Sequence, residues 1–304
     1  MKKISIIGAA GTLGSSCAMT VLMDRYAQEL CLIDVNGKLL DNHIMDLENA
    51  FPDQQMYRGE YKDLAGSHIV IITAGVPNRN DETSRNAYLA DNLKIFETIG
   101  SNIAKYSPEA IVVTASNPVD LLNYYLYTNF NFQRSQLIGY TLNDSYRFAW
   151  AINKTLNRRD ALFSPVIGEH GETQVPLFSQ VKKNNKRIEF TSEQIEQIKG
   201  DIQGWFVTFN RLNVPRTTGW TTAVGVSHLI KALGKKEKTI LTGSVILDEE
   251  FEQDNLSIGV PIEVNQNGMQ RIVEWNLSET ESEAFNQSIR KIKTVIEENH
   301  SVFQ

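Results

Sequence analysis

A histidine between two glycines is the first residue of this chain whose type and setting suggest chemistry. His170 stands in the run Gly168-Glu169-His170-Gly171, which is predicted to lie at the end of a strand. Histidine is the side chain that most readily takes up and releases a proton near neutral pH. A lone histidine, however, is more often a hydrogen-bonded structural residue. A catalytic interpretation therefore requires a carboxylate and a substrate anchor within reach of the ring.

Asp144 and Arg147 supply such a pair of groups. They lie in a segment, Asn143 to about Leu156, that is predicted to be a helix, and residues three apart share one helix face. We expect Asp144 to hold the imidazole of His170 in one tautomer and to stabilise its charged form. We expect Arg147 to bind a substrate carboxylate through two parallel N–H bonds. The alternative for this pair is an ordinary salt bridge on a solvated helix face.

Arg85 and Asn117 are further polar candidates, each placed after a predicted strand. Arg85 closes a polar loop that begins after Gly75, and its guanidinium could move over a bound substrate to polarise the carbonyl. Asn117 precedes Pro118 and could hydrogen-bond the substrate oxygen or the reactive side of a bound cofactor. The alternatives are a surface arginine that caps a loop and a plain Asn-Pro turn.

The elements that would position these groups begin with a glycine turn. An apolar strand, Ile4 to Ile7, runs into Gly8-Ala9-Ala10-Gly11-Thr12-Leu13-Gly14 and then into a predicted helix. Glycine permits a tight turn close to phosphates, and the positive end of the helix faces their charge. The next strand ends in Asp34, which can accept hydrogen bonds from ribose hydroxyls and would repel the extra phosphate of NADP. The predicted cofactor is NAD, although the glycine spacing is one residue longer than usual and is weak evidence by itself.

Strands alternate with helices through the first half of the chain, which predicts an α/β fold with a doubly wound parallel (Rossmann) sheet. Ligands collect at the carboxyl ends of such strands, and Gly8, Asp34, Gly75 and Asn117 all follow strand ends. The expected strands after Asp34 in this half lie at 67–75, 110–114 and 137–139, and the expected helices at 37–47, at 86–106 and after Pro118. Residues 1–142 are the predicted dinucleotide-binding domain.

The second half, residues 143–304, is predicted to be an α+β substrate and catalytic domain, because strict alternation ends there. The expected strands lie at 163–168, 174–181, 238–247, 258–264 and 272–277. The expected helices lie at 143–156, 192–213, 220–233 and 279–299.

Composition limits the other classes of function. The chain has 304 residues, a formal net charge of -6 and two cysteines, Cys17 and Cys31. The acidic balance argues against nucleic-acid binding, and the apolar surroundings of the cysteines predict buried thiols rather than a disulfide or a metal site. The apolar run near the N-terminus is too short for a signal peptide, and no segment approaches a membrane span. We expect a cytoplasmic protein with no membrane partner and with a small-molecule substrate.

Several motifs occur in the order found in the lactate and malate dehydrogenase family, which the chain resembles over nearly its whole length. The resemblance is closest to the lactate-dehydrogenase-like malate dehydrogenases. The matching segments are Cys31-Leu32-Ile33-Asp34-Val35, Met45-Asp46-Leu47, Thr73-Ala74-Gly75, Ser116-Asn117-Pro118-Val119-Asp120, Asp144-Ser145-Tyr146-Arg147-Phe148, Gly168-Glu169-His170-Gly171-Glu172 and Gly259-Val260-Pro261. Their joint occurrence is far more specific than any one motif.

The resemblance implies an NAD-dependent 2-hydroxy acid dehydrogenase without a metal. As hydride passes to the nicotinamide, the hydroxyl proton passes to His170, which Asp144 supports, while Arg85 polarises the oxygen. The substrate-binding residues implied are Arg147, Arg79, Asn78, Asn117 and Thr218. The cofactor-binding residues implied are Gly8, Gly11, Gly14, Asp34, Thr73, Ala74, Gly75, Asn92 and Asn117. Thr218 matches a family threonine two residues before a tryptophan, although Pro215-Arg216 replaces the usual lead-in.

The substrate depends on one loop position. Family members specific for malate carry an arginine there, which pairs with the second carboxylate, and those specific for lactate carry a glutamine. Counted forward from Gly75 the position is Asn78, and counted back from Arg85 it is Arg79, because the loop has one extra residue. Arg79 would select a dicarboxylate, whereas Asn78 would fit an uncharged side chain. We expect malate, since the long glycine turn resembles the malate version and the loop offers an arginine, Arg79. L-Lactate or another (S)-2-hydroxy acid is the alternative.

Two other classes share this architecture. A non-catalytic NAD-binding sensor should lack at least one of four site residues, and all of them are present: His170, Asp144, Arg147 and Arg85. An NAD-dependent, metal-using glycosidase should carry a Cys/His metal pair, and none is evident. The resemblance also implies a homodimer or a homotetramer.

Overall fold

The structure is a computed structural model, and it describes residues 1–76, 89–212, 214 and 217–303. One nine-stranded sheet crosses the molecule in the order β13-β12-β11-β6-β5-β4-β1-β2-β3. Its parallel part consists of β1 (Lys3–Ile7), β2 (Glu29–Ile33), β3 (Gln55–Arg58), β4 (Ile69–Ile72), β5 (Ile111–Thr114) and β6 (Leu137–Gly139). Every residue of β1, β4 and β5 is buried, as expected for parallel strands covered on both faces.

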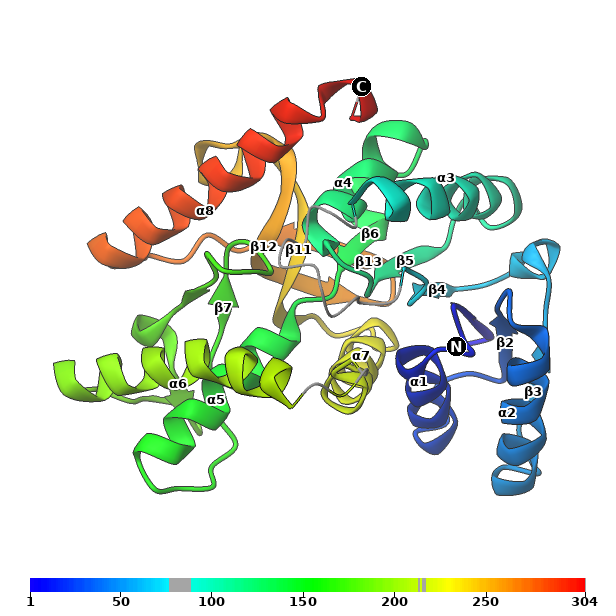
Figure 1. The fold of residues 1–304 in the computed structure, drawn as a ribbon, viewed down its shortest axis with the longest axis horizontal. Coiled ribbons are helices and arrows are strands. Elements are labelled where there is room, and N and C mark those ends of the chain that lie inside the picture. Colours follow the sequence, from blue (N-terminus) through cyan, green and yellow to red (C-terminus); the bar gives the residue numbers. More distant parts are fainter. Residues whose placement is uncertain (77–88, 213, 215–216, 304) are drawn as a thin grey trace.

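Helices cover both faces of the parallel strands. Figure 1 shows α3 and α4 on one side and α1 and α7 on the other. The bounds are α1 (Thr12–Met23), α2 (Gly37–Ala50), α3 (Leu89–Tyr106), α4 (Val119–Asn129) and α7 (Gly219–Leu233). The side chain of Asn36 accepts the Leu39 N–H and so caps the start of α2. The expected doubly wound arrangement is confirmed.

The parallel strands continue directly into an antiparallel group. Gly139 of β6 pairs with Ser244 of β11, so one sheet joins the two halves of the chain. The antiparallel strands are β11 (Thr239–Asp248), β12 (Asp254–Asn265) and β13 (Gly268–Ile272). Two small hairpins lie outside this sheet: β7 (Val166–Ile167) with β8 (Val175–Pro176), and β9 (Lys182–Lys183) with β10 (Lys186–Arg187).

Three long helices complete the second half: α5 (Leu142–Thr155), α6 (Ser192–Arg211) and α8 (Glu279–Glu298). Ser278 and Glu281 cap each other's backbone N–H at the start of α8. Helix α6 packs along α5 (Figure 1) around a small separate core of Phe148, Ala151, Ile152, Val166, Val181, Ile198 and Ile202. Short 3-10 turns occur at Tyr61–Leu64, Arg134–Gln136, Phe178–Gln180, Glu250–Glu252 and His300–Val302.

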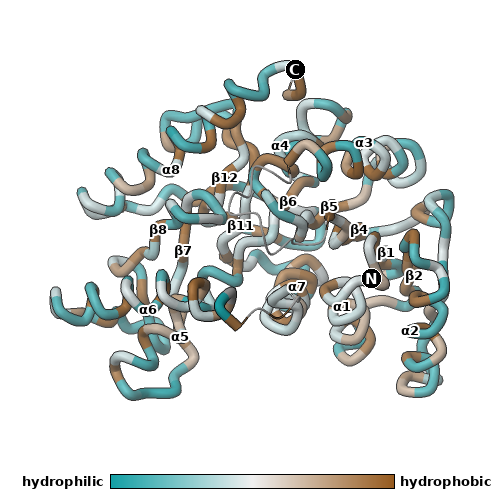
Figure 2. The backbone as a smooth tube through the Cα atoms, in the orientation of Figure 1, coloured by the Kyte–Doolittle hydropathy of each residue, from teal (hydrophilic) through white to brown (hydrophobic). Residues whose placement is uncertain are grey.

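Figure 2 shows hydrophobic colour on strands such as β2 and β12 and hydrophilic colour on much of α2 and α8, which border the solvent. Cys17 and Cys31 are free, buried thiols, as predicted. Burial raises the pKa of the Cys17 thiol to about 12, so this sulfur stays protonated and packs as a small apolar group. Within the described ranges, no helix combines the length and apolarity needed to cross a bilayer.

Four strands of the structure differ clearly from the prediction. The strands expected at 163–168 and 174–181 shrink to two residues each. The last strand lies at Gly268–Ile272 rather than 272–277, because Gly268 has a φ of +90° that lets the chain turn straight back from β12. The edge strand β3 is absent from the prediction, since Gln55–Arg58 contains no apolar run.

Candidate active site

The glycine turn after β1 is shaped by two close backbone approaches. Gly8 has a φ of +87°, and a Cβ there would lie 2.5 Å from the Ala74 backbone nitrogen. A Cβ on Gly14 would lie 2.2 Å from the Gly8 carbonyl oxygen, so α1 begins against the turn itself. Gly11 occupies the N-cap of α1, where a Cβ would make only ordinary contact at 3.4 Å. Gly8 and Gly14 therefore leave no room for a side chain, whereas Gly11 does.

The start of α1 suits a bound diphosphate. Its first turn holds no acidic residue, and no side chain caps its N-terminus. The unpaired N–H groups and the positive end of the helix dipole are therefore available to negative oxygens. These features, together with a turn that Cβ atoms would fill, fit the pyrophosphate of NAD.

Asp34 lies at the end of β2 beside this turn. Its Oδ2 accepts the Ala10 N–H at 2.9 Å, and its Oδ1 accepts the Asn36 N–H at 2.8 Å. A carboxylate has about four acceptor positions, so these bonds orient the group and leave acceptor capacity for hydroxyl donors. Asp34 thus also ties the glycine turn to β2, a structural role that the sequence did not reveal.

Polar side chains join the chain after β4 to the ends of β1 and β5. Thr73 donates to the Ile7 and Gly8 carbonyls at 3.0 and 3.1 Å. The buried Asn92 accepts the Val76 N–H and donates to the Asn117 carbonyl, both at 2.8 Å. Asn117 itself is exposed at the end of β5. The side-chain amide of Asn92 therefore ties the chain after β4 to the chain after β5.

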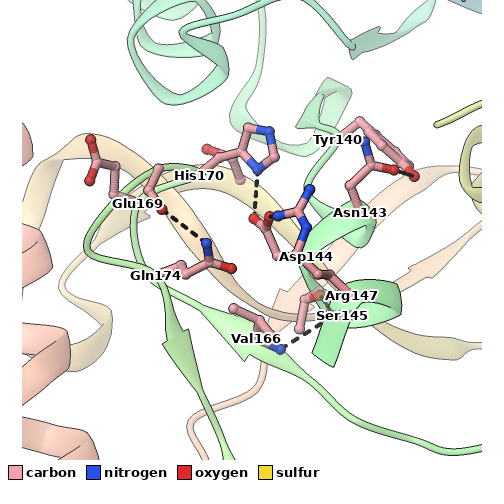
Figure 3. Close-up of polar contacts among 12 residues, drawn as sticks. Tyr140, Asn143, Asp144, Ser145, Arg147, Val166, Glu169, His170 and Gln174 are labelled. Carbon is pink, nitrogen blue, oxygen red and sulfur yellow. Dashed lines mark hydrogen bonds and ion pairs between the residues drawn. The ribbon is translucent and has the colours of Figure 1, made fainter. Parts of the chain in front are cut away.

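His170 and Asp144 meet across two elements of the second half (Figure 3). His170 Nδ1 lies 2.6 Å from Asp144 Oδ2, and Arg147 Nη1 donates to Asp144 Oδ1 at 3.2 Å. The three side chains are 12%, 5% and 14% exposed, in the order His170, Asp144, Arg147. One nearly buried carboxylate thus contacts both the imidazole and the guanidinium. Its position in the first turn of α5 also places its charge near the positive end of that helix.

The backbone of His170 is held by a second buried acid, Asp120. Its Oδ2 accepts the His170 N–H at 2.8 Å, and its Oδ1 accepts the Ser244 hydroxyl at 2.5 Å. Burial raises the pKa of Asp120 from 3.8 to about 6, although both hydrogen bonds oppose the rise. The sequence placed Asp120 in a family motif but gave it no role.

The loop that carries His170 is also held by contacts with β12 and α8. Gly168 exchanges backbone hydrogen bonds of 2.8 and 3.1 Å with Gly259 of β12. Ser288 of α8 accepts the Glu169 N–H at 2.6 Å, and Lys291 pairs with the Glu169 carboxylate at 3.1 Å. A Cβ on Gly168, whose φ is +88°, would lie 2.8 Å from Ser288 Oγ. The imidazole is therefore presented from a rigid turn.

Thr218 is linked to helix α5 through Asn143. Asn143 Nδ2 lies 3.4 Å from Thr218 Oγ1 and 2.7 Å from Thr222 Oγ1, and its Oδ1 accepts the Tyr140 hydroxyl at 2.9 Å. Figure 3 shows Tyr140 and Asn143 beside the His170–Asp144 pair. The structure thus brings Thr218 to the residue that precedes Asp144.

Three of the expected residues, Arg85, Arg79 and Asn78, lie outside the described residues. Among those described, no group of three or more His, Cys, Asp or Glu side chains is arranged to hold a metal ion. The sequence missed Asp120 and Ser288, and it also missed Trp205, whose ring lies against Arg147.

A dinucleotide-binding turn, combined with a carboxylate-supported histidine and an arginine, defines a class of nicotinamide-dependent dehydrogenases that act on hydroxy acids. The family model described as lactate/malate dehydrogenase, NAD binding domain, matches residues 2–139, and that of the alpha/beta C-terminal domain matches residues 141–302. The chain belongs to the lactate/malate dehydrogenase family. The predictions of an oxidoreductase that acts on a CH–OH group and of NAD as its cofactor are confirmed.

Individual relatives come from both branches of the family. A malate dehydrogenase of Natronomonas pharaonis is 34% identical over 302 residues, 96% of this chain and 97% of the relative. An L-lactate dehydrogenase of Acetivibrio thermocellus is 30% identical over 309 residues, 97% of this chain and 96% of the relative. The crystal structure of a malate dehydrogenase of Cryptosporidium parvum superposes with a TM-score of 0.91 at 28% identity, covering 99% of both chains.

Proposed function

We propose that this chain interconverts malate and oxaloacetate with NAD as cofactor. The long glycine turn, residues 8–14, supports malate through its resemblance to the malate version of the family turn. The malate dehydrogenase of Natronomonas pharaonis also shares more of this sequence than the lactate dehydrogenase of Acetivibrio thermocellus, 34% against 30%. Bound NAD supplies the hydride acceptor of the reaction.

His170 takes the hydroxyl proton of the substrate in this proposal. Its Nδ1 is bonded to Asp144 at 2.6 Å, which assigns the proton exchange to Nε2. The charge of Asp144 stabilises the imidazolium that forms and keeps the ring in one orientation. The rigid turn that carries His170 keeps this ring in place through the reaction.

Arg147 binds the substrate carboxylate, and the remaining roles follow the family pattern. Arg85 polarises the reacting oxygen, and Arg79 pairs with the second carboxylate, or Asn78 occupies that position. Asn117 and Thr218 contact the substrate. The cofactor contacts Gly8, Gly11, Gly14, Asp34, Thr73, Ala74, Gly75, Asn92 and Asn117.

The single observation that carries the proposal is the Asp144 carboxylate shared by His170 and Arg147. It supports the proposal because one carboxylate holds both the imidazole and the guanidinium, and oxidation of a 2-hydroxy acid requires a proton acceptor beside a carboxylate anchor. The test is a steady-state panel of oxaloacetate, pyruvate and branched 2-oxo acids with NADH. The proposal predicts the highest kcat/KM for oxaloacetate. A higher value for pyruvate would assign the chain to lactate, and no turnover of any acid would indicate an NAD-binding sensor.

L-Lactate or another (S)-2-hydroxy acid is the second candidate substrate. It is favoured if Asn78 rather than Arg79 faces the substrate side chain, because an amide offers no charge to a second carboxylate. The double variant Asn78→Arg, Arg79→Asn exchanges the two residues and tests which of the two positions selects the substrate. A gain in oxaloacetate use would place Asn78 at the selecting position.

We further propose that the protein is a cytoplasmic homodimer or homotetramer. We also propose that its dinucleotide-binding domain ends at residue 142 and its substrate and catalytic domain begins at residue 143. Exposed apolar side chains on α1 and α7 support association: Met19, Met23, Trp220 and Val224 are 40%, 61%, 71% and 48% exposed. Two free thiols suit a reducing compartment. Light scattering of the purified protein measures the oligomeric state. A monomer at all concentrations would contradict the proposed homodimer or homotetramer.

A further inference from the structure

Helix α6 carries an apolar stripe whose last part reaches the active site. Ile198, Ile202, Trp205 and Phe209 are spaced by four, three and four residues, so they share one helix face. Ile198 and Ile202 are buried in the small core between α5 and α6. The two aromatic residues continue the stripe toward the end of α6 and are half-buried.

Trp205 lies against the guanidinium of Arg147. The Arg147 Cζ is over the indole, 4.6 Å from the ring centroid. The other aromatic residue of the stripe, Phe209, stacks on Trp205 with centroids 5.1 Å apart and planes 15° apart. Asp144 contacts Arg147 through Nη1, at 3.2 Å. Arg147 is thus held by an aromatic ring and by a carboxylate.

A guanidinium that rests on a ring is restrained without using its hydrogen-bond donors. The ring attracts the cation over its face, whereas all five N–H donors lie in the guanidinium plane. Bidentate binding of a carboxylate requires that plane to be correctly oriented. We propose that Trp205 is a positioning residue that orients Arg147 for the substrate carboxylate. This inference rests on the proposed role of Arg147.

The contact predicts a specific kinetic effect. Loss of the aromatic face should raise the KM for the 2-oxo acid by about tenfold, the change expected for a partly desolvated cation–π contact. The kcat should change much less, because Trp205 touches neither His170 nor Asp144 in the described contacts. The dissociation constant for NADH should be unchanged, since the glycine turn is unaffected.

The experiment compares Trp205→Phe with Trp205→Leu, using the best 2-oxo acid of the substrate panel. Both variants keep apolar bulk in the stripe, but only phenylalanine keeps an aromatic face. Val207→Ala is the matched control, because Val207 lies on the same helix and is 49% exposed. Steady-state kinetics, NADH fluorescence titration and melting temperature are measured for each. A high KM in Trp205→Leu with a nearly normal KM in Trp205→Phe supports the inference.

Equal KM values in the phenylalanine and leucine variants overturn it, as does a loss of kcat and melting temperature with KM unchanged. Arg147→Lys separates this failure from failure of the proposed function. If Arg147→Lys raises KM and Trp205→Leu does not, Trp205 is structural and the carboxylate role of Arg147 stands. If Arg147→Lys leaves KM unchanged, the assignment of Arg147 is itself wrong, and the role of Trp205 falls with it.

Discussion

The buried carboxyl of Asp120 should make the free energy of unfolding fall as pH rises from about 4 to about 6. Its pKa is raised from 3.8 to about 6 in the folded protein, chiefly by desolvation. Between these values the folded state holds a proton that the unfolded chain has lost, so stability decreases with increasing pH. This rise in the pKa of Asp120 corresponds to about 3 kcal/mol at 25 °C. The contribution is fully present below pH 3.8 and is lost above about 6.

Asp120→Asn removes this titration and keeps a side-chain oxygen that can accept the His170 N–H. Urea unfolding at pH 4, 5, 6 and 7 gives the free energy of unfolding for the variant and the unmodified protein. The difference between them should move in favour of the variant by about 2 kcal/mol between pH 4 and pH 7, because the unfolded carboxyl is already partly ionised at pH 4. Groups remote from Asp120 titrate alike in both proteins and cancel in this difference.

Ser244→Ala provides the matched control on the same carboxyl. The Ser244 hydroxyl lowers the pKa of Asp120, so its removal should raise that pKa further and extend the pH-dependent range upward. Parallel stability curves for Asp120→Asn and the unmodified protein would refute the reasoning. They would mean that the Asp120 carboxyl ionises alike in the folded and unfolded states.

Three further predictions address the site. His170→Asn should still bind NADH, by fluorescence titration, yet lose turnover by several orders of magnitude, and retained activity would refute the assignment. Arg79→Gln should weaken kcat/KM for oxaloacetate far more than for pyruvate, whereas an equal effect on both would shift the specificity role to Asn78. Gly14→Ala, whose Cβ would lie 2.2 Å from a backbone oxygen, should lower NADH affinity and melting temperature more than Gly11→Ala, where the nearest atom is 3.4 Å away. Equal losses in these two glycine variants would contradict the steric argument.

The parallel half of the fold could be predicted because burial on both faces leaves a direct mark on the sequence. Strand β4 is an uninterrupted apolar run, and the helices around it carry apolar residues at helical spacing. Strand β3 left no such mark, because it lies at the sheet edge and only Met56 is buried. The position of β13 depends on the turn at Gly268, whose backbone conformation an apolar pattern does not record.

Part of the site could be predicted for a similar reason. Asp144 and Arg147 are three residues apart on one helix, so their proximity follows from local geometry. The contacts that hold His170 do not follow from local geometry, because Asp120 lies 50 residues away in the sequence. Trp205 did leave a signal in the four-three-four spacing of the α6 stripe, but spacing alone does not reveal that the stripe ends at a guanidinium.

The supports of His170 come from both halves of the chain, and this links catalysis to their packing. Asp120 belongs to α4 in the first half, whereas Ser288 and Gly259 belong to α8 and β12 in the second. Asp120 is joined in turn to Ser244 of β11, the strand that pairs with β6 and makes the sheet continuous. The orientation of the imidazole is therefore determined where the two halves meet. Since the glycine turn lies in the first half and Asp144 in the second, the proposed function makes this junction the place that orients His170 relative to a bound cofactor.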